Sequence, residues 1–275
     1  MRHQIFLLMS FFSQLTAVTP KEDVLYHNTQ DDVLHVFSYP RSGTNFLVSL
    51  LTELSQRKAG HYGRLHNSAW NPLNLPIDTN LPPVFVVHYP DHISSLIDNE
   101  SHLLIALVRN FKENGTRNLY DLNTNSSQSI QELLKNTSSF PILKKFIMGK
   151  TIDKRNYLPY FEILNIYDSW PEDKRLLIYY ENLITHPEKE AKRIAAFLSL
   201  NEENLVERVN HLQQKILENF SNRHKSYTSG KDLLAYSKKL SKEEHYFLDN
   251  YVKSTYPVLW EKYLSRYSFE NTIGK

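Results

Sequence analysis

The stretch Val36-Phe37-Ser38-Tyr39-Pro40-Arg41-Ser42-Gly43-Thr44-Asn45-Phe46-Leu47 decides the fold of this chain. Apolar residues at its beginning predict a short buried strand, which the Tyr39-Pro40 pair ends. After it, leucines recur at helical spacing, at Leu47, Leu50, Leu51 and Leu54. The pattern therefore predicts a strand, a tight turn and a helix, in that order.

The predicted turn has the chemistry of an anion site. The first backbone N–H groups of a helix lack partners, and the helix dipole favours negative charge there. Gly43 lets the backbone approach a ligand closely, and Arg41 adds a full positive charge. Ser42 and Thr44 offer hydroxyl donors, although either one could instead cap the helix of an ordinary turn. The P-loop signature G-x-x-x-x-G-K-[ST] is absent.

Three further apolar segments predict buried strands, at residues 84–87, 103–108 and 175–180. Helical patterns occupy residues 129–149, 160–170 and 188–198, whereas residues 57–83 read as a long loop. This alternation predicts a single α/β domain with a mostly parallel sheet flanked by helices. Ligands of such sheets bind beyond the carboxyl ends of the strands. Candidate site residues at or just beyond these ends are Arg41, His88, Arg109 and Tyr180.

Composition narrows the class of protein. A length of 275 residues suits one large α/β domain, and a hydrophobic share of 41% supports a packed core. The 32 Lys and Arg nearly balance the 30 Asp and Glu, which argues against a general nucleic-acid-binding protein. The chain has no Cys, which excludes disulfides and thiol catalysis, and no H-E-x-x-H spacing for a metal.

Residues 1–19 have the pattern of an export signal, with Arg2, an apolar run and small residues near Ala17. The alternative is an N-terminal helix packed on the domain. The apolar run is too short to span a membrane, and no later segment has ~18 consecutive apolar residues. We therefore expect a signal-like segment followed by one domain over residues 20–275. Glycosylation sequons, which matter only in a secretory compartment, are at Asn99, Asn114, Asn125, Asn136 and Asn219.

The stretch from Tyr39 to Leu47 resembles the donor-binding loop of sulfotransferases, usually Tyr-Pro-Lys-Ser-Gly-Thr-Thr-Trp-Leu. In that family the loop wraps the 5′-phosphate of the sulfate donor PAPS (3′-phosphoadenosine-5′-phosphosulfate). Here Arg41 stands at the Lys position and Phe46 at the Trp position. The resemblance implies a sulfotransferase fold related to the P-loop nucleotide triphosphatases. It also implies donor binding by Arg41, Ser42, Gly43, Thr44, Asn45 and Phe46.

Later segments extend this resemblance. Residues 104–110 are similar to the second donor motif of the family, which implies that Arg109 holds the 3′-phosphate. Arg117 stands where the family has a phosphate-binding Ser. Residues 176–198 are similar to a family segment whose Tyr, here Tyr180, contacts the donor adenine. Arg223 stands near the position of a family Arg that closes over the 3′-phosphate.

His88 is the candidate general base, because a neutral imidazole can take a hydroxyl proton near neutral pH. His88-Tyr89-Pro90 resembles the base segment Lys-Thr-His-Leu-Pro of the family, although Val86 replaces its Lys. His92 is the alternative base. By resemblance, Arg41 is the catalytic cation that stabilises charge on the leaving phosphate. Candidate walls of an acceptor pocket are Tyr62, His66 and Trp70.

These observations predict an enzyme that transfers the sulfuryl group of PAPS, without a metal, to a hydroxyl of a small molecule or glycan and releases PAP. One alternative is a noncatalytic PAP- or PAPS-binding protein, because Val86 and the 3′-phosphate motif depart from the family. Another is a different phosphate-binding transferase, against which the missing P-loop Lys counts. The compartment stays open, since the signal-like segment indicates export whereas PAPS indicates the cytoplasm or the Golgi lumen.

Overall fold

A computed structural model of the chain describes residues 32–61, 73, 75–88, 93, 96–97, 101–125, 139–149, 160–220, 233–234 and 236–272. Several sequence predictions lie outside these residues. They concern the signal-like segment 1–19, the pocket candidates Tyr62, His66 and Trp70, the alternative base His92, and Arg223.

Five parallel strands form one sheet in the order β2-β3-β1-β4-β5. The strands are β1 (Val33–Ser38), β2 (Ala59–His61), β3 (Val84–Val87), β4 (His102–Val108) and β5 (Arg175–Tyr179). In the central register, Val36 lies between Val86 of β3 and Ile105 of β4. The predicted parallel α/β sheet is therefore confirmed.

Two details of the sheet differ from the sequence prediction. The edge strand β2 lies in the region predicted to be a loop, because three residues with one Gly are too short to show an alternating pattern. The last strand ends at Tyr179, and Tyr180 is instead the first residue of a helix. Tyr180 therefore follows the strand end rather than forming it.

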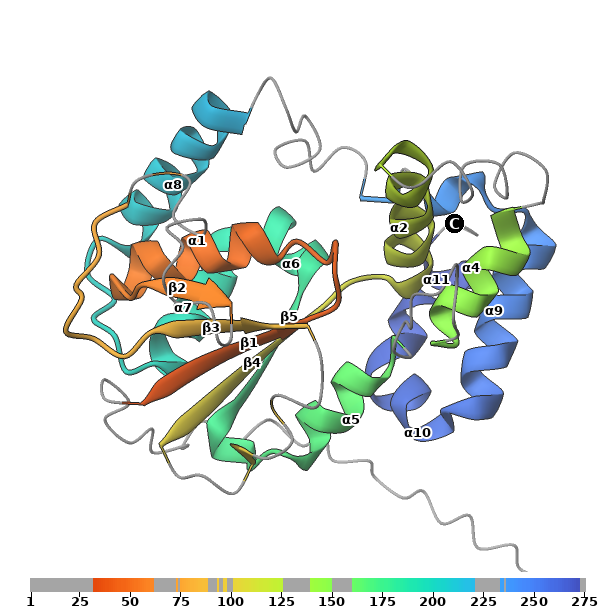
Figure 1. Ribbon diagram of the computed structural model, residues 1–275, viewed down its shortest axis with the longest axis horizontal. Coiled ribbons are helices and arrows are strands. Elements are labelled where there is room, and N and C mark those ends of the chain that lie inside the picture. Colours follow the sequence, from red (N-terminus) through yellow and green to blue (C-terminus); the bar gives the residue numbers. More distant parts are fainter. Residues whose placement is uncertain are drawn as a thin grey trace, which may run out of the picture.

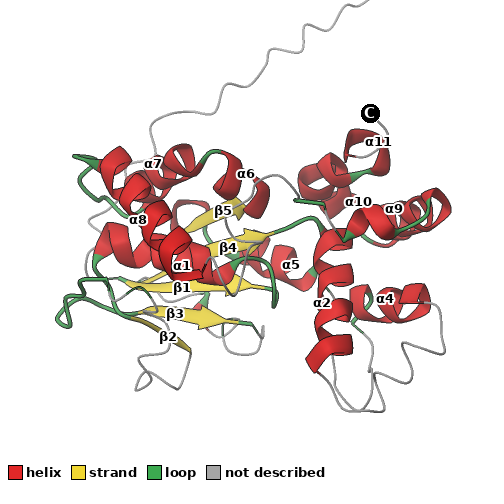
Figure 2. Cartoon of the chain, turned by 90° about the horizontal axis from the view of Figure 1, so that it is seen from above, coloured by secondary structure: helices red, strands yellow, loops and turns green. Residues whose placement is uncertain are grey.

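The described helices form two groups (Figures 1 and 2). The first group covers the faces of the sheet with α1 (Thr44–Ser55), α5 (Glu162–Ser169), α6 (Tyr180–Thr185) and α7 (Pro187–Phe197), and α8 (Leu205–Phe220) packs on α1 and α7. The second group lies beyond the tips of the strands and comprises α2 (Phe111–Asn125), α4 (Ser139–Ile147), α9 (Lys242–Thr255), α10 (Pro257–Leu259) and α11 (Phe269–Thr272). The predicted helices that follow the first strand and occupy residues 160–170 and 188–198 are confirmed as α1, α5 and α7, with slightly shifted ends.

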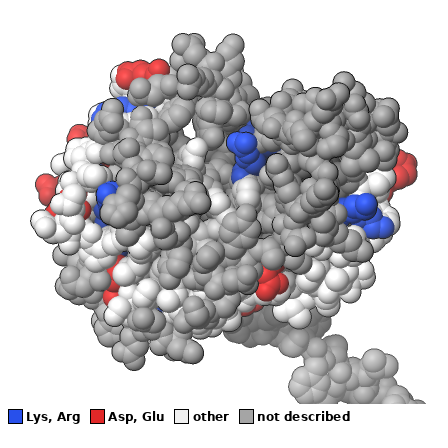
Figure 3. Space-filling model, viewed as in Figure 1, with Lys and Arg blue, Asp and Glu red and all other residues white. Residues whose placement is uncertain are grey.

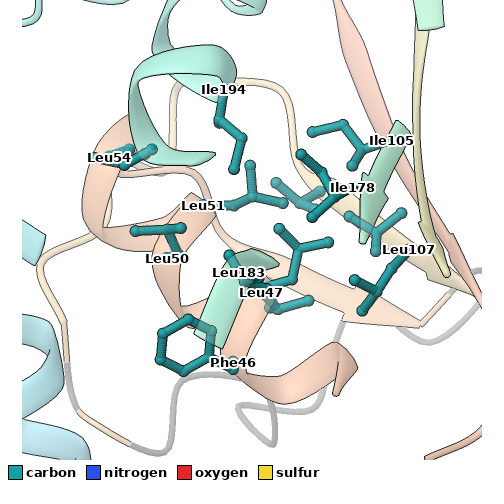
Figure 4. Close-up of a cluster of buried hydrophobic side chains, with 14 of the residues drawn as sticks. Phe46, Leu47, Leu50, Leu51, Leu54, Ile105, Leu107, Ile178, Leu183 and Ile194 are labelled. Carbon is teal, nitrogen blue, oxygen red and sulfur yellow. The ribbon is translucent and has the colours of Figure 1, made fainter. Parts of the chain in front are cut away.

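Both faces of the sheet are covered by hydrophobic clusters, because alternate residues of a strand point to opposite faces. In β4, Leu103, Ile105 and Leu107 join one cluster, whereas the residues between them join the other. The first cluster is completed by the predicted apolar stripe of α1 and by residues of α6 and α7 (Figure 4). This packing fixes α1 over the sheet and so places its first turn at the strand tips. Within the described part of the chain, no helix has the length and apolarity needed to cross a membrane.

Candidate active site

The predicted site residues follow the ends of four strands. His88 comes directly after β3, Arg109 after β4 and Tyr180 after β5, while Arg41 lies three residues beyond the end of β1. Because the strands are parallel, these ends share one edge of the sheet, which faces α2 in Figure 2. The sequence prediction that these residues lie at one edge is confirmed.

The turn between β1 and α1 is tight and left-handed at two positions. Arg41 has a φ of 68° and Gly43 a φ of 99°, and the N–H of Ser42 donates to the carbonyl of Tyr39 at 3.1 Å. Helix α1 begins after Gly43, and no side chain caps it. The alternative of an ordinary cap by Ser42 or Thr44 is therefore wrong. The start of α1 thus has no side-chain cap, and the anion site at this turn stays a prediction.

The two hydroxyls of the turn have other partners. Thr44 Oγ1 lies 2.7 Å from Ser38 Oγ, at the end of β1. Ser42 is fully buried, and its Oγ accepts a hydrogen bond of 3.0 Å from Nδ2 of Asn114. Both hydroxyls thus hold the shape of the turn in this structure.

Tyr180 packs directly on the turn. A Cβ atom added to Gly43 would lie 2.2 Å from Cδ2 of the Tyr180 ring, so only a glycine fits there. Arg109 also lies against this ring, with its guanidinium carbon 4.2 Å from the ring centre. Tyr180 is therefore a buried aromatic surface between the turn and Arg109.

Arg109 is only 2% exposed, and several neighbours contact its guanidinium. Its Nη1 donates to the carbonyl of Arg41 at 3.3 Å, and its Nη2 lies 3.5 Å from Oε1 of Glu113. Its buried Nε has no hydrogen-bond acceptor within the described residues. A buried N–H without an acceptor is costly, so this atom is a candidate donor to a ligand anion.

Tyr160 fixes the backbone of Arg109. The N–H of Arg109 donates to the Tyr160 hydroxyl at 2.9 Å, and that hydroxyl donates to the carbonyl of Arg109. Burial raises the pKa of Tyr160 well above its ordinary value, so the hydroxyl keeps its proton. The start of α2 is fixed as well, because Asn110 Oδ1 accepts from the N–H groups of Lys112 and Glu113.

Glu113 and Arg117 follow Arg109 at successive turns of α2. Glu113 is fully buried, and its Oε2 accepts from the backbone N–H groups of Tyr236 at 3.0 Å and Ser237 at 2.7 Å. Burial raises the pKa of Glu113, while the N–H of Ser237 and the nearby Arg109 act against that rise. The Arg117 guanidinium lies 5.0 Å from the Tyr236 ring centre, and its buried Nε has no acceptor among the described residues. Two arginines with unused donors thus flank one carboxylate.

Two asparagines of α2 clamp the turn. Nδ2 of Asn114 and Nδ2 of Asn118 both donate to the carbonyl of Pro40, at 3.2 and 3.1 Å. Asn118 also donates to Oδ1 of Asn114 at 2.9 Å. Since Asn114 is fully buried, its sequon is inaccessible to glycosylation in the folded chain.

His88 is oriented by the end of β1. Its Nδ1 lies 2.7 Å from the carbonyl oxygen of Ser38. A carbonyl only accepts hydrogen bonds, so Nδ1 carries the proton and Nε2 is the basic nitrogen of the neutral ring. This is the protonation pattern that a general base requires.

The comparison with known families identifies the chain. Residues 30–253 match the family described as "Sulfotransferase domain". The chain belongs to the sulfotransferase family.

Solved structures of similar fold agree with this assignment. A mouse sulfotransferase, SULT7A1, complexed with PAP matches with a TM-score of 0.60 and 14% identity, over 83% of this chain and 85% of that one. Retinol dehydratase in complex with androsterone and PAP matches with a TM-score of 0.55 and 15% identity, over 80% and 79% of the two chains. A second retinol dehydratase structure, with retinol and PAP, has a TM-score of 0.54, 15% identity and coverage of 82% and 81%.

In this sulfotransferase, the remaining predicted site residues differ in their exposure to solvent. Arg41 and Asn45 are exposed, whereas Phe46 is 5% exposed and packs in the hydrophobic cluster of α1 (Figure 4). Val86, at the position of the family Lys, is buried in the same cluster. In Figure 3, basic side chains reach this face at several separate places, one of them above its middle. Among the described residues, no group of three His, Asp or Glu is arranged to hold a metal ion.

The sequence reasoning missed the residues that support the site: Ser38, Glu113, Asn114, Asn118 and Tyr160. For α2 a signal was available. Arg109, Glu113 and Arg117 recur every four residues, as do Asn110, Asn114 and Asn118. Such spacing directly after a strand places two polar stripes on one helix at the site.

Proposed function

We propose that this sulfotransferase transfers the sulfuryl group of PAPS to a hydroxyl of an acceptor and releases PAP. The observation that carries the proposal is Arg109. It is buried beneath the β1–α1 turn, and its Nε has no acceptor among the described residues. A cation in this state is suited to a bound phosphate.

Two ends of the donor would be held by different elements. The N-terminus of α1, with Gly43 and Thr44, and the exposed Arg41 suit the 5′-phosphate. Arg109 and Arg117, whose buried Nε donors lack acceptors in the described chain, suit the 3′-phosphate. PAP in the three similar solved structures supports PAPS as the donor. The adenine contact of Tyr180, the donor contacts of Ser42, Asn45 and Phe46, and the role of Arg223 belong to this proposal as well.

The chemistry would use His88 and Arg41. Nε2 of His88 accepts the proton of the acceptor hydroxyl while the new oxygen–sulfur bond forms. The bond between sulfur and the bridging phosphate oxygen breaks, and Arg41 stabilises the negative charge that develops on that oxygen. No step requires a metal.

The acceptor is proposed to be a small molecule with a hydroxyl group, since the similar retinol dehydratase structures hold androsterone or retinol. A glycan is the alternative acceptor. We also propose that residues 1–19 direct the domain, residues 20–275, to the secretory pathway. A noncatalytic PAP-binding protein is the second candidate function, favoured by Val86 in the place of the family Lys.

The test compares PAP binding by the wild type, Arg109→Ala and Arg175→Ala. Arg175 is a matched control, because it pairs with Asp168 at the opposite end of the sheet. Loss of a charged contact of about 1.5–3 kcal/mol predicts that Arg109→Ala binds PAP roughly 10- to 150-fold more weakly. Arg175→Ala should bind PAP as the wild type does.

Turnover with radiolabelled PAPS and a panel of acceptors separates the two candidate functions. Transfer of label to an acceptor supports the enzyme. PAP binding without transfer to any acceptor supports the noncatalytic protein. Equal PAP binding by the wild type and Arg109→Ala would contradict the assignment of the donor site.

A further inference from the structure

We infer that Glu113 is a positioning residue whose single carboxylate fixes Arg109 and Arg117 for the 3′-phosphate of the donor. The inference rests on the proposed function, because it assigns a role within the same site. Glu113 takes no part in the proposed chemistry. Its full burial next to two cations therefore needs an explanation.

One oxygen of the carboxylate faces Arg109. Glu113 Oε1 lies 3.5 Å from Nη2 of Arg109 and makes no hydrogen bond within the described residues. The carbonyl of Arg41 and the ring of Tyr180 hold the same guanidinium on its other sides. The guanidinium plane is thus fixed by three neighbours, while its buried Nε has no acceptor among the described residues.

The other oxygen fixes Arg117 through a second segment. Glu113 Oε2 accepts from the backbone N–H groups of Tyr236 and Ser237, at the start of the short 3₁₀ helix Ser237–Lys239. These bonds hold the Tyr236 ring against the guanidinium of Arg117, at 5.0 Å. Both arginines that carry unused donors are therefore oriented by one carboxylate.

A merely structural role explains Glu113 less well. Helix α2 is joined to α9 by the buried pair Lys112–Asp249, with Nζ and Oδ1 at 2.7 Å. It is joined to the β1–α1 turn by Asn114 and Asn118. In addition, a carboxylate beside a phosphate site repels the ligand. Removing it should strengthen phosphate binding unless its positioning of the arginines outweighs that repulsion.

The test is whether removing the charge of Glu113 weakens or strengthens binding of the 3′-phosphate. Kd is measured for PAP and for AMP, which lacks the 3′-phosphate, with the wild type and Glu113→Gln. A glutamine has almost the same size but only one acceptor oxygen, so it cannot serve both Arg109 and the Tyr236–Ser237 backbone. We expect PAP binding to weaken about tenfold or more, while AMP binding changes less than about twofold.

Glu190→Gln is the matched control. Glu190 is 1% exposed and its Oε2 pairs with Nη1 of Arg193 at 2.5 Å, on α7 of the first helix group. This variant should keep the wild-type preference for PAP over AMP. Glu113→Asp is the second test variant, since it keeps the charge but shortens the side chain. It should also lose part of the preference.

Each other outcome has a separate meaning. An unchanged or increased PAP preference in Glu113→Gln would mean that Glu113 is only a counter-charge, and the inference would be overturned. An equal loss of PAP and AMP binding together with a lower Tm would assign Glu113 to structure alone and would also overturn it. A wild type that does not prefer PAP to AMP would instead refute the proposed donor site itself.

Discussion

At the scale of single residues, one hydrogen bond decides whether His88 can act as a base. Its Nδ1 donates to the carbonyl of Ser38, so Nε2 is the nitrogen that can accept a proton. The acceptor is a backbone carbonyl fifty positions earlier in the chain. No side-chain pattern around His88 could reveal it, which is why the sequence predicted the residue but not its tautomer.

The first prediction concerns this histidine. His88→Ala should lower turnover by about 10²–10⁴-fold, because that is the usual contribution of a general base. PAP affinity should change little, since Arg109 and the turn after β1 are intact. The measurement is initial rate at saturating PAPS together with PAP binding by calorimetry.

His92→Ala is the comparison for this experiment. If His92→Ala loses turnover while His88→Ala retains it, the base is His92. If both variants stay active, the reaction does not use a histidine base, and the replacement of the family Lys by Val86 would then reflect a different acceptor chemistry.

At the scale of secondary-structure elements, the sequence predicted those with a local apolar pattern and missed those that depend on contacts with distant segments. The strands β1, β3, β4 and β5 were predicted because a buried parallel strand is a continuous apolar run. Helix α2 was missed because its stabilising contacts are polar and buried, such as Lys112 with Asp249. A run of charged and amide residues reads as a solvated surface until a second element is known to cover it.

The same reasoning applies to the site. Arg109 was predictable because it follows a strand, and a strand end is visible in the sequence. Glu113 was not singled out, because its partners Tyr236 and Ser237 are more than 120 residues away. The residues that follow the strand tips could therefore be predicted, whereas the long-range contacts through which Glu113 orients them could not.

The second prediction tests how the β1–α1 turn packs on α6. Gly43→Ala should destabilise the fold by more than about 1 kcal/mol, because the alanine takes a left-handed φ and also meets the Tyr180 ring. The clash should displace Tyr180 from Arg109 and so weaken PAP binding. Thermal unfolding and PAP titration measure the two effects separately.

Gly149→Ala is the matched control for the turn, because Gly149 also has a positive φ, of 68°, but follows α4. It should cost stability without changing PAP affinity. A double variant of Gly43→Ala with Tyr180→Leu should regain part of the lost stability. If Gly43→Ala leaves PAP binding intact, the contact with Tyr180 does not shape the donor site.

At the scale of the whole molecule, buried histidines link folding to pH. His35 lies in the central strand, fully buried, with its Nε2 2.7 Å from Nδ1 of His102. Burial, with a smaller effect of His102, lowers the pKa of His35 to about 3 from its ordinary 6.5. In α9, burial and the nearby Lys112 lower the pKa of His245 to about 4.

A lowered histidine pKa means that the folded state binds the proton less readily than the unfolded state does. The contribution of His35 to stability is therefore complete above pH 6.5, and it falls as the pH drops from 6.5 towards 3. Between pH 7.5 and 5.5 this single residue should remove about 1.4 kcal/mol from the free energy of unfolding. Burial raises the pKa values of Glu113 and Asp249, and these carboxyl groups act in the opposite direction, so the effect must be isolated by substitution.

The third prediction is that His35→Phe reduces the loss of stability between pH 7.5 and 5.5 by about 1.4 kcal/mol relative to the wild type. Urea unfolding at the two pH values measures this difference. Phe85→Leu is the control, because the Phe85 ring stacks on His35 with centres 5.8 Å apart but does not titrate. It should lower stability by the same amount at both pH values. An unchanged pH dependence in His35→Phe would show that His35 is protonated equally in the folded and unfolded chains, and acid sensitivity of the fold would then have to come from other groups.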